Sequence, residues 1–311
     1  MSLETEMIQT TLADAYAYAC TKQAGENASY IPYLASVPSD LCGFAVVTAA
    51  GDVFQVGDAE FEFAIESISK VFTLCNVIDA IGADALQQKV GADPTGLPFN
   101  SVMALELHGG KPLSPLVNAG AISTASLVSG DGPEARWQSI LATQSAFAGR
   151  SIQLSDEVNE SEQTTNFHNR AIAWLMYSAE ACYSDPMAAV DVYTRQCSTL
   201  VNAVDLATMG ACLANGGINP RTQQQVLAES NVHPVLAEMM MEGLYDASGD
   251  FAFEVGLPGK SGVGGGVLAV VPGQLAIAGF APPLDEVGNS VRARAGISYF
   301  AKELGLNLFT P

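Results

Sequence analysis

The positions of the β-rich segments limit the folds that this chain can adopt, because those segments lie only near its two ends. Strands are predicted at 43–50, 53–56, 251–255, 266–271 and 275–280. Tight turns at Gly51-Asp52 and Pro272-Gly273 join neighbouring runs, which indicates antiparallel hairpins. A sheet assembled from both ends of a chain must accept everything between them as an insertion.

The inserted middle of the chain has mainly helical periodicity. Helices are predicted at 3–21, from about 67 to 81, and at 138–148, 169–181, 185–197, 204–214 and 290–304. The stretch Gly91–Pro115 is richer in Gly and Pro and is predicted to be an ordered surface loop. We therefore expect one α/β domain of α+β type over 1–311. Its antiparallel sheet lobe would take about 1–66 and 246–311, flanked by helices, and its helical lobe about 67–245.

The composition indicates a globular protein with a large buried core. Hydrophobic residues make up 49% of the chain and charged residues only 15%. The net charge is −20, from 13 basic and 33 acidic residues. Such a surface repels phosphate backbones and anionic lipids, so we expect neither a nucleic-acid nor a membrane partner. No apolar run approaches the length of a membrane-spanning helix.

The amino-terminal residues and the cysteines indicate a cytoplasmic protein without a metal or cofactor. Met1 to Glu6 contains two acids and no base, unlike a signal peptide. The six cysteines are widely spaced and form no C-x-x-C pair, so we expect free thiols in a reducing compartment. With three isolated histidines besides, the sequence offers no recognisable metal site and no local support for a Ser-His-Asp triad.

The segment Ser67-Ile68-Ser69-Lys70 is the strongest local indication of chemistry. Residues three apart on a helix lie on one face, so the Ser67 hydroxyl and the Lys70 amine are expected to be close together. Burial lowers the pKa of a lysine, which can then take the proton of a serine nucleophile. The alternative interpretation is a helix cap followed by a solvated lysine. An S-x-x-K pattern on its own is weak, since chance produces it often.

A second segment, Lys260-Ser261-Gly262-Val263 followed by three glycines, leads into a predicted strand. Glycines there let backbone N–H groups approach a substrate closely. A phosphate-binding loop is excluded, because Glu254 occupies the position of its first glycine and a strand follows in place of a helix. A plain glycine-rich bulge remains the alternative. S-x-x-K followed by K-S-G is much more specific, and the pair with K-T-G is known from β-lactamases and penicillin-binding proteins. The S-D-N motif of those enzymes does not occur here.

From about Tyr30 to the carboxyl terminus, the sequence resembles the serine-dependent glutaminase family, whose members share the β-lactamase-like fold. The resemblance rests on stretches in family order: 30–32, 66–72, 96–100, 117–122, 161–162, 166–169 and 259–265. The sequence is most similar to bacterial glutaminases linked to ammonia release during acid stress. One departure is Glu66, where many members have Gln, and we expect it to alter the pH dependence because it adjoins the serine.

The resemblance implies an amidohydrolase that converts L-glutamine to L-glutamate and ammonia. It identifies Ser67 as the nucleophile and Lys70 as its proton acceptor. Substrate-contacting positions are implied at Tyr30, Ser67, Asn118, Glu162, Asn169, Tyr193, Tyr245 and Val263. It also implies a homodimer or homotetramer and no cofactor. Two alternatives stay open: another S-x-x-K acyl-enzyme, such as a β-lactamase or carboxypeptidase, and a glutamine-binding protein without catalysis.

The chemistry of glutamine agrees with this set of residues. Glu162 can hold the α-ammonium, and Asn118 and Asn169 can donate to the α-carboxylate. Glu162 and Asn169 are seven apart and would face one way on a continuous helix. For the oxyanion hole we expect the backbone N–H groups of Ser67 and Val263.

Three further residues are assigned supporting roles. Tyr193 and Tyr245 are the candidates for relaying a proton to the departing ammonia, and the sequence does not choose between them. Lys260 is expected to tune the site electrostatically.

Overall fold

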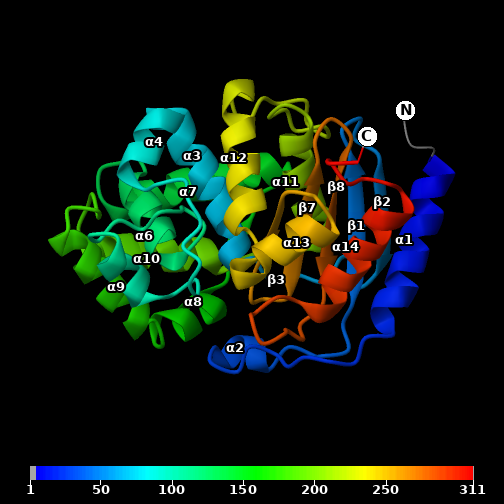
Figure 1. The fold of residues 1–311 in the computed structure, drawn as a ribbon, viewed down its shortest axis with the longest axis horizontal. Helices are drawn as coiled ribbons and strands as arrows, with labels where there is room; N and C mark the ends of the chain where they lie inside the picture. The colour runs from blue at the N-terminus through cyan, green and yellow to red at the C-terminus, as the bar shows by residue number, and fades with distance from the viewer. Residues whose placement is uncertain (1–4, 311) are drawn as a thin grey trace.

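The computed structural model describes residues 5–310, and its main sheet is built from both ends of the chain (Figure 1). Its strands are β1 (Gly43–Thr48), β2 (Val53–Gly57), β6 (Gly259–Ser261), β7 (Gly266–Val271) and β8 (Leu275–Phe280). They lie in the order β2-β1-β8-β7-β6, and every neighbouring pair is antiparallel. The pairing of β1 with β8 joins the two ends, with Val46 opposite Ile277. The predicted antiparallel sheet is confirmed.

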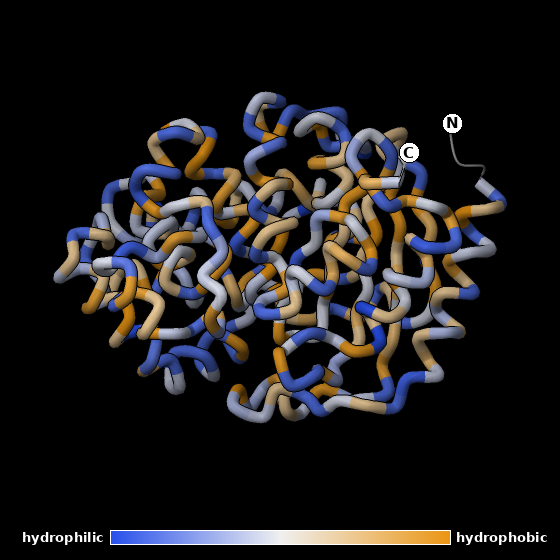
Figure 2. The backbone as a smooth tube through the Cα atoms, viewed as in Figure 1, coloured by the Kyte–Doolittle hydropathy of each residue, from blue (hydrophilic) through white to orange (hydrophobic). Residues whose placement is uncertain are grey.

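Strand β1 is apolar without alternation because both of its faces are buried. Phe44 and Val46 belong to the core between the sheet and the two terminal helices. Ala45 and Val47 belong to the larger core on the opposite face. Figure 2 shows the same pattern, with hydrophobic colouring along the strands in the interior. A strand that is half solvated would have shown polar residues at every second position.

Helices cover both faces of the sheet. The first and last helices, α1 (Thr5–Cys20) and α14 (Val291–Glu303), pack side by side on one face (blue and red in Figure 1). Helix α11 (Ala203–Ala214) covers the other face. Its start is set by a capping box, in which Asn202 and Asp205 bond each other's backbone N–H groups. The predicted start of the first helix at Leu3 lies outside the described residues.

The remaining helices form mostly a layer beside the sheet (Figure 1). They are α2 (Pro32–Ala35), α3 (Ser69–Ile81), α4 (Ala83–Lys89), α5 (Val102–Leu107), α6 (Asn118–Leu127), α7 (Pro133–Ala148), α8 (Asp156–Gln163), α9 (Phe167–Ser178), α10 (Pro186–Cys197), α12 (Glu229–Glu242) and α13 (Ser248–Glu254), with 3-10 turns η1 (Glu66–Ile68) and η2 (Tyr245–Ala247). A small sheet, β3 (Phe63–Ala64), β5 (Thr199–Val201) and β4 (Gln153–Leu154), ties the segment before Ser67 to this layer.

Two local expectations are wrong. The predicted strand 251–255 lies mostly in helix α13, whose residue Phe253 is 91% exposed while Phe251 and Val255 are buried. Apolar residues at i and i+4 fit a helix as well as a strand, and the true edge strand is β6. The loop predicted at 91–115 contains helix α5, which Ser101 caps by accepting from the Ala104 N–H.

Among the helices of residues 5–310, none is both long enough and apolar enough to cross a lipid bilayer.

The ring of Phe44 offers a test of how the sheet and α14 pack. It is fully buried, and Gly279 of β8 and Gly296 of α14 press against it so closely that a Cβ at either position would overlap the ring. We predict that Phe44→Ala lowers the free energy of unfolding by about 3–5 kcal/mol, because the cavity cannot close fully. Urea denaturation measures the change. Val53→Ala, at a residue 39% exposed, is the control and should change little.

Candidate active site

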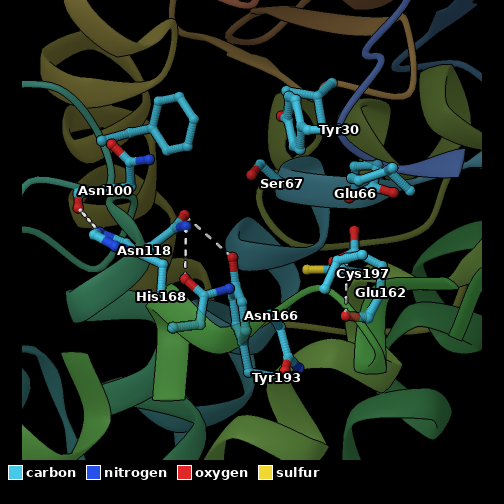
Figure 3. A pocket seen from close by; sticks show the side chains of 15 residues that line it. Tyr30, Glu66, Ser67, Asn100, Asn118, Glu162, Asn166, His168, Tyr193 and Cys197 are labelled. Carbon is cyan, nitrogen blue, oxygen red and sulfur yellow. Dashed lines mark hydrogen bonds between the residues drawn. The ribbon is translucent and has the colours of Figure 1, made fainter. Parts of the chain in front are cut away.

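A cavity of about 290 Å³ lies where the edge of the main sheet meets the helical layer (Figure 3). Of the residues that the sequence analysis selected, its wall contains Tyr30, Ser67, Asn118, Glu162, Asn169, Tyr193 and Val263. Lys70 and Tyr245 are not on the wall but are buried behind it. Segments separated by more than two hundred residues therefore meet at one small site.

Ser67 lies in the 3-10 turn η1, directly before helix α3. The residue before it, Glu66, has a backbone φ of 51°, which residues other than glycine rarely adopt. Strain of this kind persists only where surrounding contacts enforce it, and it is common at functional sites. One such contact is the hydrogen bond of 2.9 Å from the Ile65 N–H to the Thr199 carbonyl. The turn brings the Ser67 side chain to the cavity, where it is 7% exposed.

Lys70 lies one turn further along and is 1% exposed. Its Nζ donates to the Leu116 carbonyl at 3.2 Å and to Asn118 Oδ1 at 2.7 Å. Burial lowers the pKa of Lys70 to about 8, although the nearby Cys197, Glu66 and Glu242 side chains each act to raise it. In roughly a tenth of the protein molecules, Lys70 is therefore a free amine at neutral pH. The alternative interpretation of Lys70 as a solvated lysine is wrong, and the buried amine can accept a proton.

Asn118 connects three polar side chains of the site, and Figure 3 draws its hydrogen bond with Tyr193. Its Oδ1 accepts from Lys70 and, at 3.2 Å, from the Tyr193 hydroxyl. Its Nδ2 donates to Asn169 Oδ1 at 3.1 Å. Two donors on Oδ1 fix the orientation of the amide, so Nδ2 faces Asn169.

The glycine-rich segment after β6 packs against the turn that carries Ser67. A Cβ on Gly262 or Gly264 would collide with the backbone of 64–65 and crowd the stem of Glu66. Glycine at these positions lets Val263 approach Ser67 closely. Within residues 5–310, neither the Ser67 N–H nor the Val263 N–H donates to a protein acceptor. Two unbonded donors at one cavity can bind an anionic oxygen.

Tyr245 and Lys260 lie behind the wall. Tyr245 has a φ of 55°, and its hydroxyl donates to the Ser261 carbonyl at 3.3 Å. Burial raises the pKa of Tyr245, and a hydrogen bond with Ser67 opposes that rise. Lys260 is fully buried, donates to the Gly243 and Ser261 carbonyls at 2.8 Å, and sits 4.4 Å from the centre of the Tyr245 ring. Burial and the charge of Lys70 lower the pKa of Lys260.

Glu162 and Asn169 lie on two separate helices, so the single helical face considered for them does not exist. Helix α8 ends at Gln163, and α9 begins at Phe167. Both residues nevertheless line the cavity, because the end of α8 and the start of α9 both face it. Tyr193, on α10, is buried beneath them, and burial raises its pKa.

Several wall residues were not selected as site residues, namely Phe99, Asn100, Thr165, Asn166 and Cys197. Phe99 and Asn100 belong to the 96–100 stretch, one of those that carry the family resemblance. Its place is set by the Asn118 N–H, which donates to the Phe99 carbonyl at 2.8 Å, and by His168 Nε2, which lies 2.7 Å from the Asn100 carbonyl. His168 thus holds the loop in place. No sequence pattern predicts this contact.

Among the described residues, no three His, Cys, Asp or Glu side chains are grouped so as to hold a metal ion.

Comparison with known proteins decides the family. Residues 25–309 match the protein-family profile described as Glutaminase. The chain belongs to the glutaminase family. A glutaminase from Brucella canis is 66% identical over 310 residues, which cover 100% of this chain and 98% of the relative.

Solved structures of the glutaminase family have the same fold. A structure described as the probable glutaminase ybaS is 60% identical with a TM-score of 0.98, covering 99% of this chain and 100% of that one. The Bacillus subtilis glutaminase YbgJ, solved as a covalent complex with 5-oxo-L-norleucine, is 28% identical with a TM-score of 0.86, covering 98% and 99%. The predicted β-lactamase-like arrangement of sheet and helices is confirmed.

The environment of Lys70 predicts a measurable titration. Its ¹³Cε resonance should shift with a midpoint near the pKa of about 8, because burial penalises the ammonium form. NMR of protein labelled at lysine would follow the shift, and Lys70→Ala would identify the resonance by its loss. A midpoint at the ordinary lysine value of about 10.4 would show that the amine stays charged.

Proposed function

We propose that the protein hydrolyses L-glutamine to L-glutamate and ammonia through a seryl acyl-enzyme. The main support is the position of Ser67 on the cavity wall, with a buried amine of lowered pKa three residues further along the chain. Family membership narrows the substrate, since the relatives at 60–66% identity are named glutaminases. A volume of about 290 Å³ lies at the small end of ligand pockets, roughly 300–1,000 Å³, and suits a single amino acid.

In the proposed reaction, Ser67 Oγ attacks the side-chain amide carbon of glutamine and passes its proton to Lys70. The neutral Lys70 amine has two N–H groups and one lone pair. The N–H groups are taken by Leu116 and Asn118, so the lone pair is left for the serine proton. The tetrahedral oxyanion would accept from the Ser67 and Val263 N–H groups.

Collapse of the intermediate breaks the C–N bond, and the nitrogen leaves as ammonia after receiving a proton. Tyr245 and Tyr193 both have a hydroxyl near this path. Tyr245 contacts Ser67 itself, whereas Tyr193 contacts Asn118. The geometry therefore favours Tyr245 as the relay. Water then attacks the glutamyl ester and regenerates Ser67.

Recognition of the amino-acid end is assigned to the opposite side of the cavity. Glu162 would bind the α-ammonium, and Asn118 and Asn169 would donate to the α-carboxylate. Tyr30, at the rim and 60% exposed, would contact the bound substrate. The covalent norleucine complex of the Bacillus subtilis relative supports covalent catalysis on an amino-acid-like ligand.

Two properties outside the chemistry remain predictions: a cytoplasmic location and a homodimer or homotetramer. Support for an oligomer comes from large apolar side chains exposed on α5 and α9, namely Met103, Leu107, Phe167, Trp174 and Tyr177. Light scattering after size-exclusion chromatography would determine the mass.

We predict that Ser67→Ala lowers ammonia release from glutamine by about 10⁴-fold or more, because the hydroxyl that would form the acyl-enzyme is lost. A coupled glutamate assay on the folded variant measures this, with asparagine as the comparison substrate. Ser178→Ala, at an exposed serine outside the cavity, is the control. Near-normal turnover in the Ser67 variant would remove the nucleophile.

Two further measurements, made beside the glutamate assay, separate the rival functions from a glutaminase. Hydrolysis of nitrocefin without ammonia release would indicate a β-lactamase-type acyl-enzyme. Glutamine binding in calorimetry without product would indicate a binding protein.

Glu162→Gln should raise KM by roughly ten- to a hundredfold with a smaller effect on kcat, because the charged contact with the α-ammonium is lost in ground state and transition state alike. Steady-state kinetics provide both constants. The control is Glu160→Gln, which makes the same chemical change two residues away at an exposed position of α8. An unchanged KM in the Glu162 variant would rule out the ammonium contact.

A further inference from the structure

Glu66, the residue before the nucleophile, carries a carboxyl group buried in the wall of the cavity beside Glu162 (Figure 3). Only 3% of the residue is exposed. Its left-handed φ and the close packing of Gly262 and Gly264 against its stem fix the direction of the side chain. The oxygen Oε1 is buried and has no donor partner in the protein. A fixed, unpartnered carboxyl oxygen at this depth requires an explanation.

The carboxyl groups of Glu66 and Glu162 are within hydrogen-bonding contact of each other. Two carboxylates in such contact cannot both be charged without strong repulsion, and burial adds a desolvation penalty. The surroundings favour Glu66 as the protonated member. Burial raises the pKa of Glu66 well above its usual range, and the charge and hydrogen bond of Glu162 raise it further. Burial also raises the pKa of Glu162, but there the hydrogen bond with Glu66 has the opposite effect. The two groups titrate as a pair.

We propose that Glu66 is a positioning residue, held as a carboxylic acid that donates its proton to the Glu162 carboxylate, and that this pair with one proton is the receptor for the substrate's α-ammonium. The proposal rests on the proposed function and deepens it. A pair with one proton has a single negative charge, which matches the single positive charge of the ammonium. The donated hydrogen bond would also hold the Glu162 carboxylate in place.

The neutral state of Glu66 also matters for the proposed chemistry at Ser67. A negative charge on the preceding residue would oppose the oxyanion that forms at the Ser67 and Val263 N–H groups. It would also raise the pKa of Lys70, because the Glu66 charge favours the ammonium. Ionisation of Glu66 would therefore lower the fraction of Lys70 that is a free amine and weaken the oxyanion hole.

The other titratable groups around the pair come from several elements. Lys70 on α3 is the cation that lowers the pKa of Glu66. The neutral groups facing the pair are Tyr30, Tyr193 and Cys197, with Tyr245 facing Glu66. Burial raises the pKa of each of them above its usual value, which keeps these groups neutral near neutral pH. As pH rises above the range in which the pair holds one proton, the next change in charge among the carboxyls of this wall is the loss of that shared proton.

The protonation state of the Glu66–Glu162 pair determines how kcat/KM changes with pH. At low pH both carboxyls are protonated and the ammonium is bound weakly. At intermediate pH the pair has one proton and binds the ammonium. At higher pH the pair becomes a dianion, and kcat/KM falls although Lys70 is increasingly a free amine.

The matched variants are Glu66→Gln and Glu66→Ala, with Glu160→Gln as the control on α8. An amide keeps a donor for Glu162 but cannot ionise. We expect the descending alkaline limb of kcat/KM to move to higher pH by at least about one unit in Glu66→Gln and to stay in place in Glu160→Gln. Glu66→Ala has no donor and should raise KM several-fold, an effect that Gln avoids. An unshifted limb in Glu66→Gln, or equal KM values for the Gln and Ala variants, would overturn the proposal.

Infrared spectroscopy of the free protein tests the pair without catalysis. The wild type should show a protonated carboxyl C=O band that shifts in heavy water, is missing in Glu66→Gln, and disappears with pH along the alkaline limb. A wild type without this band would refute the pair even if glutamine is hydrolysed. A band without any ammonia release would retain the pair and overturn the proposed function instead.

Discussion

The burial of the Lys70 amine is the constraint on which the site depends. An ammonium taken out of water is destabilised unless neighbouring oxygens replace its hydration. The Leu116 carbonyl and Asn118 Oδ1 replace part of it, and the pKa falls to about 8. Those two acceptors fix α6 against α3. The orientation of Asn118 then fixes Asn169 and Tyr193, so one buried amine organises a wall made from four helices.

A second constraint is the close approach of two backbones. The strained turn at Glu66 brings Ser67 to the cavity, and the glycines around Val263 allow the sheet edge to meet it. Neither segment makes the site alone. The antiparallel sheet that joins the two ends of the chain holds β6 at the correct edge, while the small sheet containing β3 holds the turn. The fold thus serves to align two segments almost two hundred residues apart.

The charges around the cavity are divided between its two sides. Lys70 and Lys260 are buried behind the wall at Ser67, and Glu66 and Glu162 line the side to which we assign the amino-acid end. This division suits a zwitterionic substrate whose reacting amide must reach the base while its ammonium reaches an acid. In a chain with a net charge of −20, two buried lysines beside one cavity are a local exception.

The sequence by itself determined the antiparallel sheet from both chain ends, the helical middle, and the Ser67–Lys70 turn with its partner at Lys260–Gly262. These features are local: apolar runs buried on both faces, and a spacing of three on a helix. Only the tertiary structure decided that 251–255 is helical and that α8 and α9 are separate. It also decided that Lys70 bonds Asn118, 48 residues away, and that Glu66 meets Glu162. Periodicity reports which face of an element is apolar, whereas partners across the fold are chosen by packing between distant segments.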